Sequence, residues 1–244
     1  ISFDSIIAAF TAVAVWSSIP LTTRLLFTFK KYQGLYFWSI LVTTWGLSIR
    51  VIGFMVKFTV PACPWILSTI LAEAGWVAMV TGFSLVMYSR LNLIIGSRRI
   101  LHLVLAMIII DGVTLHSILI VLQFGLASQP VHDPSKRAPW LAAINPMERV
   151  QVCWFTVQEL IIGLFYMKSA YDHLKDRMLP SNRARNVMVL LLVVQFIVLA
   201  LDIIIIVVDC SGYFTLKAII HSFVYAIKLD MEFVVLNQLV DISR

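Results

Sequence analysis

The sequence predicts an all-α membrane protein in which seven transmembrane helices form one bundle. Of its 244 residues, 60% are hydrophobic and only 13% are charged, whereas soluble domains are about half apolar and about a quarter charged. The mean hydropathy is +0.92, which would leave a soluble fold with too little polar surface. The apolar residues also gather in seven segments, each able to hold the about 20 residues that a helix needs to cross a bilayer.

These segments follow one another without an internal repeat or a second domain, so we expect a single transmembrane domain over residues 1–244. Helices are expected because hydrocarbon offers no partner for unpaired backbone groups. The strands of a barrel would alternate polar and apolar residues, and these segments do not. Because the chain begins with Ile rather than Met, we also expect residues to precede it. The segments span roughly residues 5–29, 35–58, 64–94, 100–126, 149–174, 186–209 and 213–240.

Glycine and proline mark the connections between the segments. Gly34 follows two lysines after the first segment, and Gly96 precedes two arginines after the third. Pro61 and Pro64 separate the second segment from the third, and Pro180 lies in a basic linker before the sixth. Three more prolines predict that the longest loop lies between the fourth and fifth segments, at Pro130, Pro134 and Pro139.

Lysine and arginine predict the orientation of the bundle, because basic connections stay on the cytoplasmic side of a membrane. The fourth connection carries two basic residues together with Asp133 and Glu148, and the second and sixth carry almost none. We therefore expect the odd-numbered connections and the C-terminus in the cytoplasm, and the N-terminus outside or in a lumen. The basic residues of the odd-numbered connections are Lys30, Lys31, Arg98, Arg99, Lys175, Arg177, Arg183 and Arg185. This placement explains the excess of basic residues without a nucleic-acid partner.

The three cysteines, Cys63, Cys153 and Cys210, fall near the predicted outer ends of their helices. That side of the membrane can oxidise thiols, so a disulfide, above all between Cys63 and Cys210, is one alternative. Three unpaired cysteines are the favoured interpretation. The spacing of Cys and His indicates no zinc site, and we expect neither a metal nor a cofactor.

Five stretches of the chain also carry a resemblance: KKYQGLYFWSILVTTWG (30–46), GWVAMVTGFSLVMYSRLNLI (75–94), RILHLVLAMIIIDGVTLH (99–116), MERVQVCWFTVQELIIGLFY (147–166) and VYAIKLDMEFVVLNQL (224–239). In this order they are similar to segments of an uncharacterised family of fungal seven-helix integral membrane proteins. The most specific parts are Tyr-Ser-Arg-Leu at 88–91 and Ile-Lys-Leu-x-x-Glu-Phe at 227–233. The resemblance implies a fungal endoplasmic reticulum or plasma membrane, and no reaction. Glu73 and Asp230 depart from the residues expected at those positions in the family.

Charged residues recur near the middle of the segments. A helix rises about 1.5 Å per residue, so residues about ten positions from either end of a segment lie near the bilayer midplane. Each such charge costs on the order of 3 kcal/mol on insertion scales. We therefore predict one shared polar centre inside the bundle rather than scattered charges facing lipid. Its members come from six different segments: Arg50, Glu73, Asp111, Glu159, Asp202 and Lys228.

The last segment carries a base and two acids within five residues. His221, Tyr225, Lys228 and Glu232 are spaced three or four apart and share one helical face. This spacing predicts an ion pair between Lys228 and Glu232. Asp230 lies about 200° around the helix from Lys228 and faces elsewhere.

Near or inside the membrane core acids outnumber fixed bases, where we count only Arg50 and Lys228 as bases. Arg50 is expected to pair with Asp111 or Asp202. Some carboxyls must then keep a proton, because burial and nearby like charge disfavour the anion. The six acids are Glu73, Asp111, Glu159, Asp202, Asp230 and Glu232.

The favoured functional hypothesis is an intramembrane acid/base enzyme, such as a terpenoid cyclase or isomerase, that acts on a lipophilic small molecule or lipid. Glu73 is the first candidate for the proton donor, because no base lies within one turn along its own helix. Asp230, Asp202 and Asp111 are the further catalytic candidates. The residues expected to bind the substrate are Trp76, Trp154, Phe155, Glu159, His221 and Tyr225.

Three other classes of function stay open. A receptor would share the topology, a proton or ion pathway would also use buried acids, and a scaffold would use the same charges only to fix helix contacts. A retinal protein is disfavoured, because Lys228 has an acid one turn later, at Glu232, and none one turn earlier.

Overall fold

A computed structural model describes residues 3–28, 34–60, 63–130, 133–176, 182–211 and 214–243, and these residues form seven helices and no strand. The all-α prediction is therefore confirmed. Several residues that mark the predicted connections lie outside the described part of the chain: Lys30, Lys31, Pro61, Arg177 and Pro180.

The helices follow the apolar segments closely. Five of them are long and apolar enough to cross a membrane, namely α2 to α6. A membrane protein is thus indicated, and crossing by α1 and α7 stays a prediction. In chain order the helices are α1 (Phe3–Thr28), α2 (Leu35–Thr59), α3 (Trp65–Ile94), α4 (Arg98–Ala127), α5 (Pro134–Asp176), α6 (Asn182–Ser211) and α7 (Phe214–Ser243).

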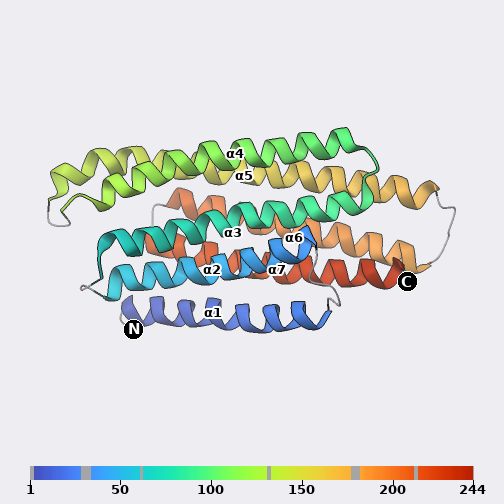
Figure 1. Cartoon of the computed structure of the whole chain (residues 1–244), viewed down its shortest axis with the longest axis horizontal. Coiled ribbons are helices and arrows are strands. Elements are labelled where there is room, and N and C mark those ends of the chain that lie inside the picture. Colours follow the sequence, from blue (N-terminus) through green and yellow to red (C-terminus); the bar gives the residue numbers. More distant parts are fainter. Residues whose placement is uncertain are drawn as a thin grey trace.

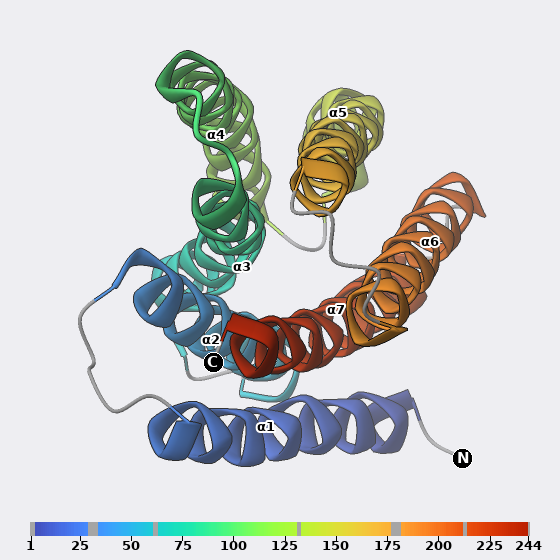
Figure 2. The same ribbon diagram turned by 90° about the vertical axis from the view of Figure 1, so that its right-hand side faces the viewer.

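The helices run side by side in one elongated bundle, with α1 beginning and α7 ending at opposite ends (Figure 1). Each helix packs against the next in the chain, and α7 also contacts α1, α2 and α3. Because α3 contacts α2, α4, α5 and α7, it lies at the centre of the bundle, whereas α1 lies outside, against α2 and α7 (Figure 2). This arrangement brings residues from α2, α3, α5, α6 and α7 into a common interior.

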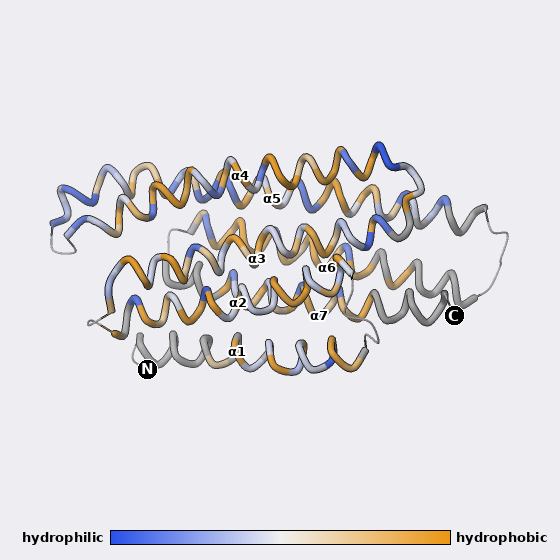
Figure 3. The backbone as a smooth tube through the Cα atoms, in the orientation of Figure 1, coloured by the Kyte–Doolittle hydropathy of each residue, from blue (hydrophilic) through white to orange (hydrophobic). Residues whose placement is uncertain are grey.

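The outer surface is apolar, as the bilayer prediction requires. Figure 3 shows hydrophobic residues along the lengths of the helices. Hydrophilic residues lie at the connection between α3 and α4 and at the connection between α4 and α5 (Figure 3). Large exposed apolar patches on a soluble protein would mark a site that binds a partner or a membrane. Here exposed apolar side chains lie on several helices. Large exposed apolar side chains include Trp16, Phe27, Leu103, Val121, Phe196 and Val207.

The prediction that the longest loop lies between the fourth and fifth segments is wrong. Helix α5 begins at Pro134 and includes most of the residues expected in that loop. Proline suits the first turn of a helix, where its missing N–H has no partner in any case. Just before it, Asp133 accepts a hydrogen bond of 2.6 Å from Ser135, and this bond lowers the pKa of the Asp133 carboxyl. Further along, Trp140 packs against Gly125 of α4, where a glycine leaves room for the indole. Packing against α4 therefore stabilises the helix within the proline-rich stretch.

All three cysteines are free thiols. The alternative of a disulfide between Cys63 and Cys210 is therefore wrong, and the favoured expectation of three unpaired cysteines is confirmed.

Helices α2 and α3 pack more closely than any other pair, because glycines line both sides of their contact. A Cβ added at Gly46 would lie 2.7 Å from the Cβ of Ala78, and one added at Gly75 would lie 2.7 Å from the Gly46 carbonyl oxygen. Small residues allow helices to approach closely in a membrane. This contact places Arg50 of α2 directly beside the Gly75 turn of α3.

Replacing Gly75 by alanine is expected to destabilise the protein by about 1–3 kcal/mol, because the new methyl group would meet the backbone of α2. Thermal unfolding in detergent measures the effect. The matched control is Gly96→Ala, since a Cβ added at Gly96 has no atom within 4 Å. Equal melting temperatures for the two variants would contradict the close contact of α2 and α3.

Candidate functional site

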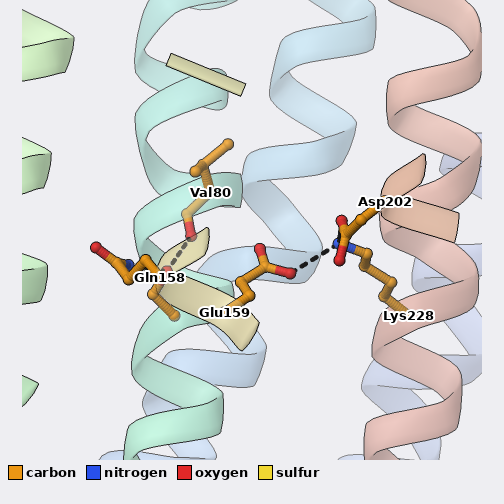
Figure 4. Close-up of polar contacts among 6 residues, drawn as sticks. Val80, Gln158, Glu159, Asp202 and Lys228 are labelled. Carbon is orange, nitrogen blue, oxygen red and sulfur yellow. Dashed lines mark hydrogen bonds and ion pairs between the residues drawn. The ribbon is translucent and has the colours of Figure 1, made fainter. Parts of the chain in front are cut away.

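A buried lysine joins three helices at the centre of the bundle. The Nζ of Lys228 (α7) lies 2.8 Å from Oε2 of Glu159 (α5) and also contacts Oδ1 of Asp202 (α6). The three side chains point toward one another in Figure 4. Lys228 is 0% exposed, and both acids are buried. We call these three residues the lysine cluster.

Aromatic rings complete the surroundings of the ammonium group. Lys228 Nζ lies 4.9 Å from the ring centre of Tyr225 and 5.2 Å from that of Phe83. Attraction between a cation and a ring face strengthens when water is excluded. The lysine cluster therefore holds its cation by two carboxyls and two rings, with one more acid than base.

A second buried pair lies one turn further along α7. Glu232 forms an ion pair with Arg90 of α3, and both side chains are buried. The Arg90 guanidinium lies 4.7 Å from the ring centre of Tyr166, and the hydroxyl of Tyr36 donates to the Glu232 carbonyl at 3.4 Å. We call Arg90 and Glu232 the arginine pair.

The predicted ion pair between Lys228 and Glu232 is therefore wrong. Both residues face the interior, as their spacing indicates, but each pairs with other helices: Lys228 with α5 and α6, and Glu232 with α3. Spacing along one helix cannot account for partners that neighbouring helices bring closer.

Arg50 occupies a pocket nearer to the α2–α3 connection. Its guanidinium carbon lies 3.8 Å from the ring centre of Trp76 and 5.3 Å from that of Phe54. The pocket is partly open to the outside. We call it the arginine pocket. Its lining residues are Arg50, Phe54, Lys57, Thr69, Ala72, Glu73, Trp76, Leu119, Gln123, Glu148, Gln151, Val152 and His221.

The expected pairing of Arg50 with Asp111 or Asp202 is wrong. Asp202 contacts Lys228 instead, and Asp111 Oδ2 is buried without a hydrogen-bond partner among the residues that the structure describes. The acids that share the pocket with Arg50 are Glu73 and Glu148. Only α3 and the extension of α5 bring these two acids near α2, and the sequence does not reveal that extension.

A chain of hydrogen bonds fixes Trp76 in the wall of the pocket. Its Nε1 donates to Gln151 Oε1 at 3.0 Å, and Gln151 Nε2 lies 3.1 Å from Nδ1 of His116. Because an amide nitrogen only donates, His116 accepts at Nδ1 and donates from Nε2 to the Thr81 hydroxyl at 3.1 Å. The His116 ring also stacks on Phe155.

Aromatic side chains connect the arginine pocket to the lysine cluster. His221 stacks on Trp76, with ring centres 5.5 Å apart, and its Nε2 lies 3.0 Å from Asp209 Oδ1. Tyr225 packs edge-on against Trp76 and lies under the Lys228 ammonium. The predicted polar centre is thus a sequence of contacts along the bundle rather than one cluster.

Most of the predicted site residues lie in the interior of the bundle. Glu159, Asp202 and Lys228 are in contact, and Trp76, Phe155, His221 and Tyr225 are buried beside them or beside the arginine pocket. Glu73 lines that pocket with two bases of α2, Arg50 and Lys57.

Two candidates point away from the interior. Trp154 is 54% exposed on the outer surface, although its neighbour Phe155 is buried. Asp230 is exposed and lies at a shallow pocket formed with Leu21 of α1 and Leu47 of α2. Neither joins the lysine cluster, because each lies on a helix face turned away from it.

The residue-by-residue prediction missed Arg90, Tyr166 and Gln151. Arg90 is detectable in the sequence, because it lies inside the third apolar segment and within the Tyr-Ser-Arg-Leu stretch, but the predicted polar centre includes only Arg50 and Lys228 as bases. Tyr166 and Gln151 carry no charge, so a count of buried charges does not find them. Over the described ranges, no group of three or more His, Cys, Asp or Glu residues is arranged to hold a metal ion.

Comparison with known proteins identifies a family for the chain. The family described as a domain of unknown function, DUF7703, matches residues 3–244. No curated protein and no solved structure matches the chain. The match agrees with the resemblance to an uncharacterised family, and the fungal source stays a prediction.

Proposed function

The chain belongs to the DUF7703 family, and from that premise and its buried charges we propose that it is a seven-helix membrane protein that moves protons through its interior. The observation that carries the proposal is the lysine cluster, in which one fully buried base contacts two acids on two other helices.

The lysine cluster contains two acids and one base, so it can hold one exchangeable proton. One ammonium group balances one carboxylate, and a second carboxylate would leave a net charge away from water. An uncompensated buried charge is costly, so the second carboxyl is better accommodated with a proton. Asp202 and Glu159 both contact the same ammonium group, so the proton can pass between them when that ammonium group shifts.

The other polar groups support a path along the bundle. Helix α5 carries Glu148 and Gln151 at the arginine pocket, Glu159 at the lysine cluster and Tyr166 at the arginine pair. From Glu148 to Tyr166 the helix rises by about 27 Å, close to the thickness of about 30 Å of a bilayer's hydrocarbon core. The charged and polar groups therefore extend over a distance comparable to the membrane barrier.

Proton movement is tested by reconstituting the protein in liposomes that contain a pH-sensitive dye. After a pH step, the protein should dissipate the gradient faster than empty liposomes, and Asp202→Asn should slow it at least tenfold. The control is Asp230→Asn, which changes an exposed acid and should conduct like the parent. Equal rates for Asp202→Asn and the parent would contradict the proposal.

An acid/base enzyme that acts on a lipophilic substrate is the second candidate, because Glu73 lines a pocket together with the aromatic side chains of Phe54 and Trp76. It is less well supported, because the ring faces that would stabilise a substrate cation already lie against Arg50 and Lys228. Lipophilic extracts of yeast that expresses the chain and is fed prenylated precursors test it. A new product that Glu73→Gln abolishes would favour the enzyme.

The proposed orientation places the N-terminus outside and the C-terminus in the cytoplasm. Arg98 and Arg99 at the start of α4 support it. A glycosylation acceptor inserted between Ser128 and Pro130 should be modified, because that connection would face the lumen. One inserted between Gly96 and Ser97 should stay unmodified, and the reverse pattern would invert the orientation.

A further inference from the structure

Arg50 has an unused hydrogen-bond donor in the arginine pocket. The residue is 7% exposed, and its Nε has no hydrogen-bond partner within the described part of the chain. A buried donor without a partner costs about 1–3 kcal/mol, and more when the group is charged. Trp76 and Phe54 lie against the guanidinium and restrict its orientation. A planar guanidinium held in this way matches the oxygens of a carboxylate or a phosphate.

The pocket also carries acids, which limits the net charge of a ligand. Glu73 of α3 and Glu148 of α5 line it together with Arg50 and Lys57, so two acids face two bases. The Glu148 carboxylate accepts a hydrogen bond of 2.9 Å from Gln123 of α4, which fixes its position. A ligand of net negative charge would meet two carboxylates, and one of net positive charge would meet two cations.

Apolar side chains form the rest of the wall. Leu119, Val152 and Phe54 line the pocket beside the charged groups. The lining therefore suits a ligand that has both charges close together and an apolar group.

We infer that the arginine pocket binds a small zwitterion, with its oxyanion at Arg50 and its ammonium group at Glu73. Two sources share this chemistry: a free amino acid and the headgroup of a zwitterionic phospholipid. The inference goes beyond proton movement and does not depend on it, because the pocket residues are distinct from the lysine cluster.

Equilibrium binding to the purified full chain in detergent tests the inference by titration calorimetry. The zwitterionic probes are L-leucine and glycerophosphoethanolamine, a soluble phospholipid headgroup. N-acetyl-leucine keeps only the negative charge, and leucine amide keeps only the positive one. At least one zwitterion should bind, and the two singly charged probes should bind at least tenfold more weakly than L-leucine if leucine is the ligand. Binding of the headgroup alone would support the inference and assign the ligand to lipid.

Substitution at Glu73 connects the affinity to the pocket. Glu73→Gln keeps the shape of the side chain but removes the partner of the ammonium group, so affinity for the zwitterion should fall at least tenfold. Affinity for N-acetyl-leucine should rise, because the repulsion of its carboxylate is reduced. Asp172→Asn, at an exposed position of α5, is the matched control and should bind like the parent.

The outcomes separate this inference from the proposed function. Asp202→Asn should bind the zwitterion normally even if it conducts no protons. The inference is overturned if neither zwitterion binds to the folded parent protein, or if Glu73→Gln binds it as tightly as Asp172→Asn does.

Discussion

Replacing Lys228 by methionine is expected to destabilise the protein by about 3–5 kcal/mol, because it leaves Glu159 and Asp202 buried without their base. Methionine has a similar volume, so loss of the charge dominates over loss of packing. The free energy of unfolding, measured by denaturant titration in detergent micelles, reports the effect.

Second substitutions then show which residues are the partners of Lys228. Adding Glu159→Gln and Asp202→Asn to Lys228→Met should recover much of the lost stability, because the site then carries no unpaired charge. Adding Glu232→Leu should recover none, because that change leaves Arg90 unpaired as well. Recovery with Glu232→Leu would show that the ion pair runs along α7 and would contradict the lysine cluster.

The arginine pair should behave as a separate unit. Arg90→Met and Glu232→Leu should each destabilise by about 3–5 kcal/mol, since each leaves the other charge buried. The double variant should be much more stable than the sum of the two losses indicates. A double-mutant cycle in the same unfolding assay measures the coupling, and additive losses would contradict direct contact between the two side chains.

The sequence predicts the helices well because composition alone distinguishes hydrocarbon from water as the solvent. Its main error lies at α5, where Pro134 and Pro139 indicate a loop. The helix begins there because proline suits the first helical position, which Pro134 occupies directly after Asp133. It also begins there because Trp140 packs against Gly125 of α4. Contacts of the latter kind lie between residues of two helices, so no local pattern reveals them.

The sequence predicts how deep in the membrane the site residues lie, but not the direction in which their side chains point. Rise per residue places Glu159, Asp202 and Lys228 at one level, and the structure confirms that they meet. Apolar residues surround each helix, however, so no polar stripe shows which face is turned inward. Trp154 and Phe155 illustrate this limit, because only their positions in the bundle decide that the first faces outward and the second inward.

The sequence also does not show which of the buried charged residues form ion pairs with one another. The sequence places Glu232 one turn from Lys228, which favours a pair on the same helix. Arg90 of α3 changes this outcome, because it supplies Glu232 with a closer partner and leaves Lys228 to α5 and α6. The choice depends on three helices that contact one another, so it needs the fold.

The central claim is that the lysine cluster holds an exchangeable proton, and infrared spectroscopy of the protonated carboxyl group tests it most directly. The parent protein should show the carbonyl stretch of a buried carboxylic acid at neutral pH, and this band should shift in D₂O. Asp202→Asn or Glu159→Gln should weaken the band, whereas Asp230→Asn should leave it unchanged. A carbonyl band that persists unchanged in both cluster variants, or the absence of any such band in the parent, would contradict the claim.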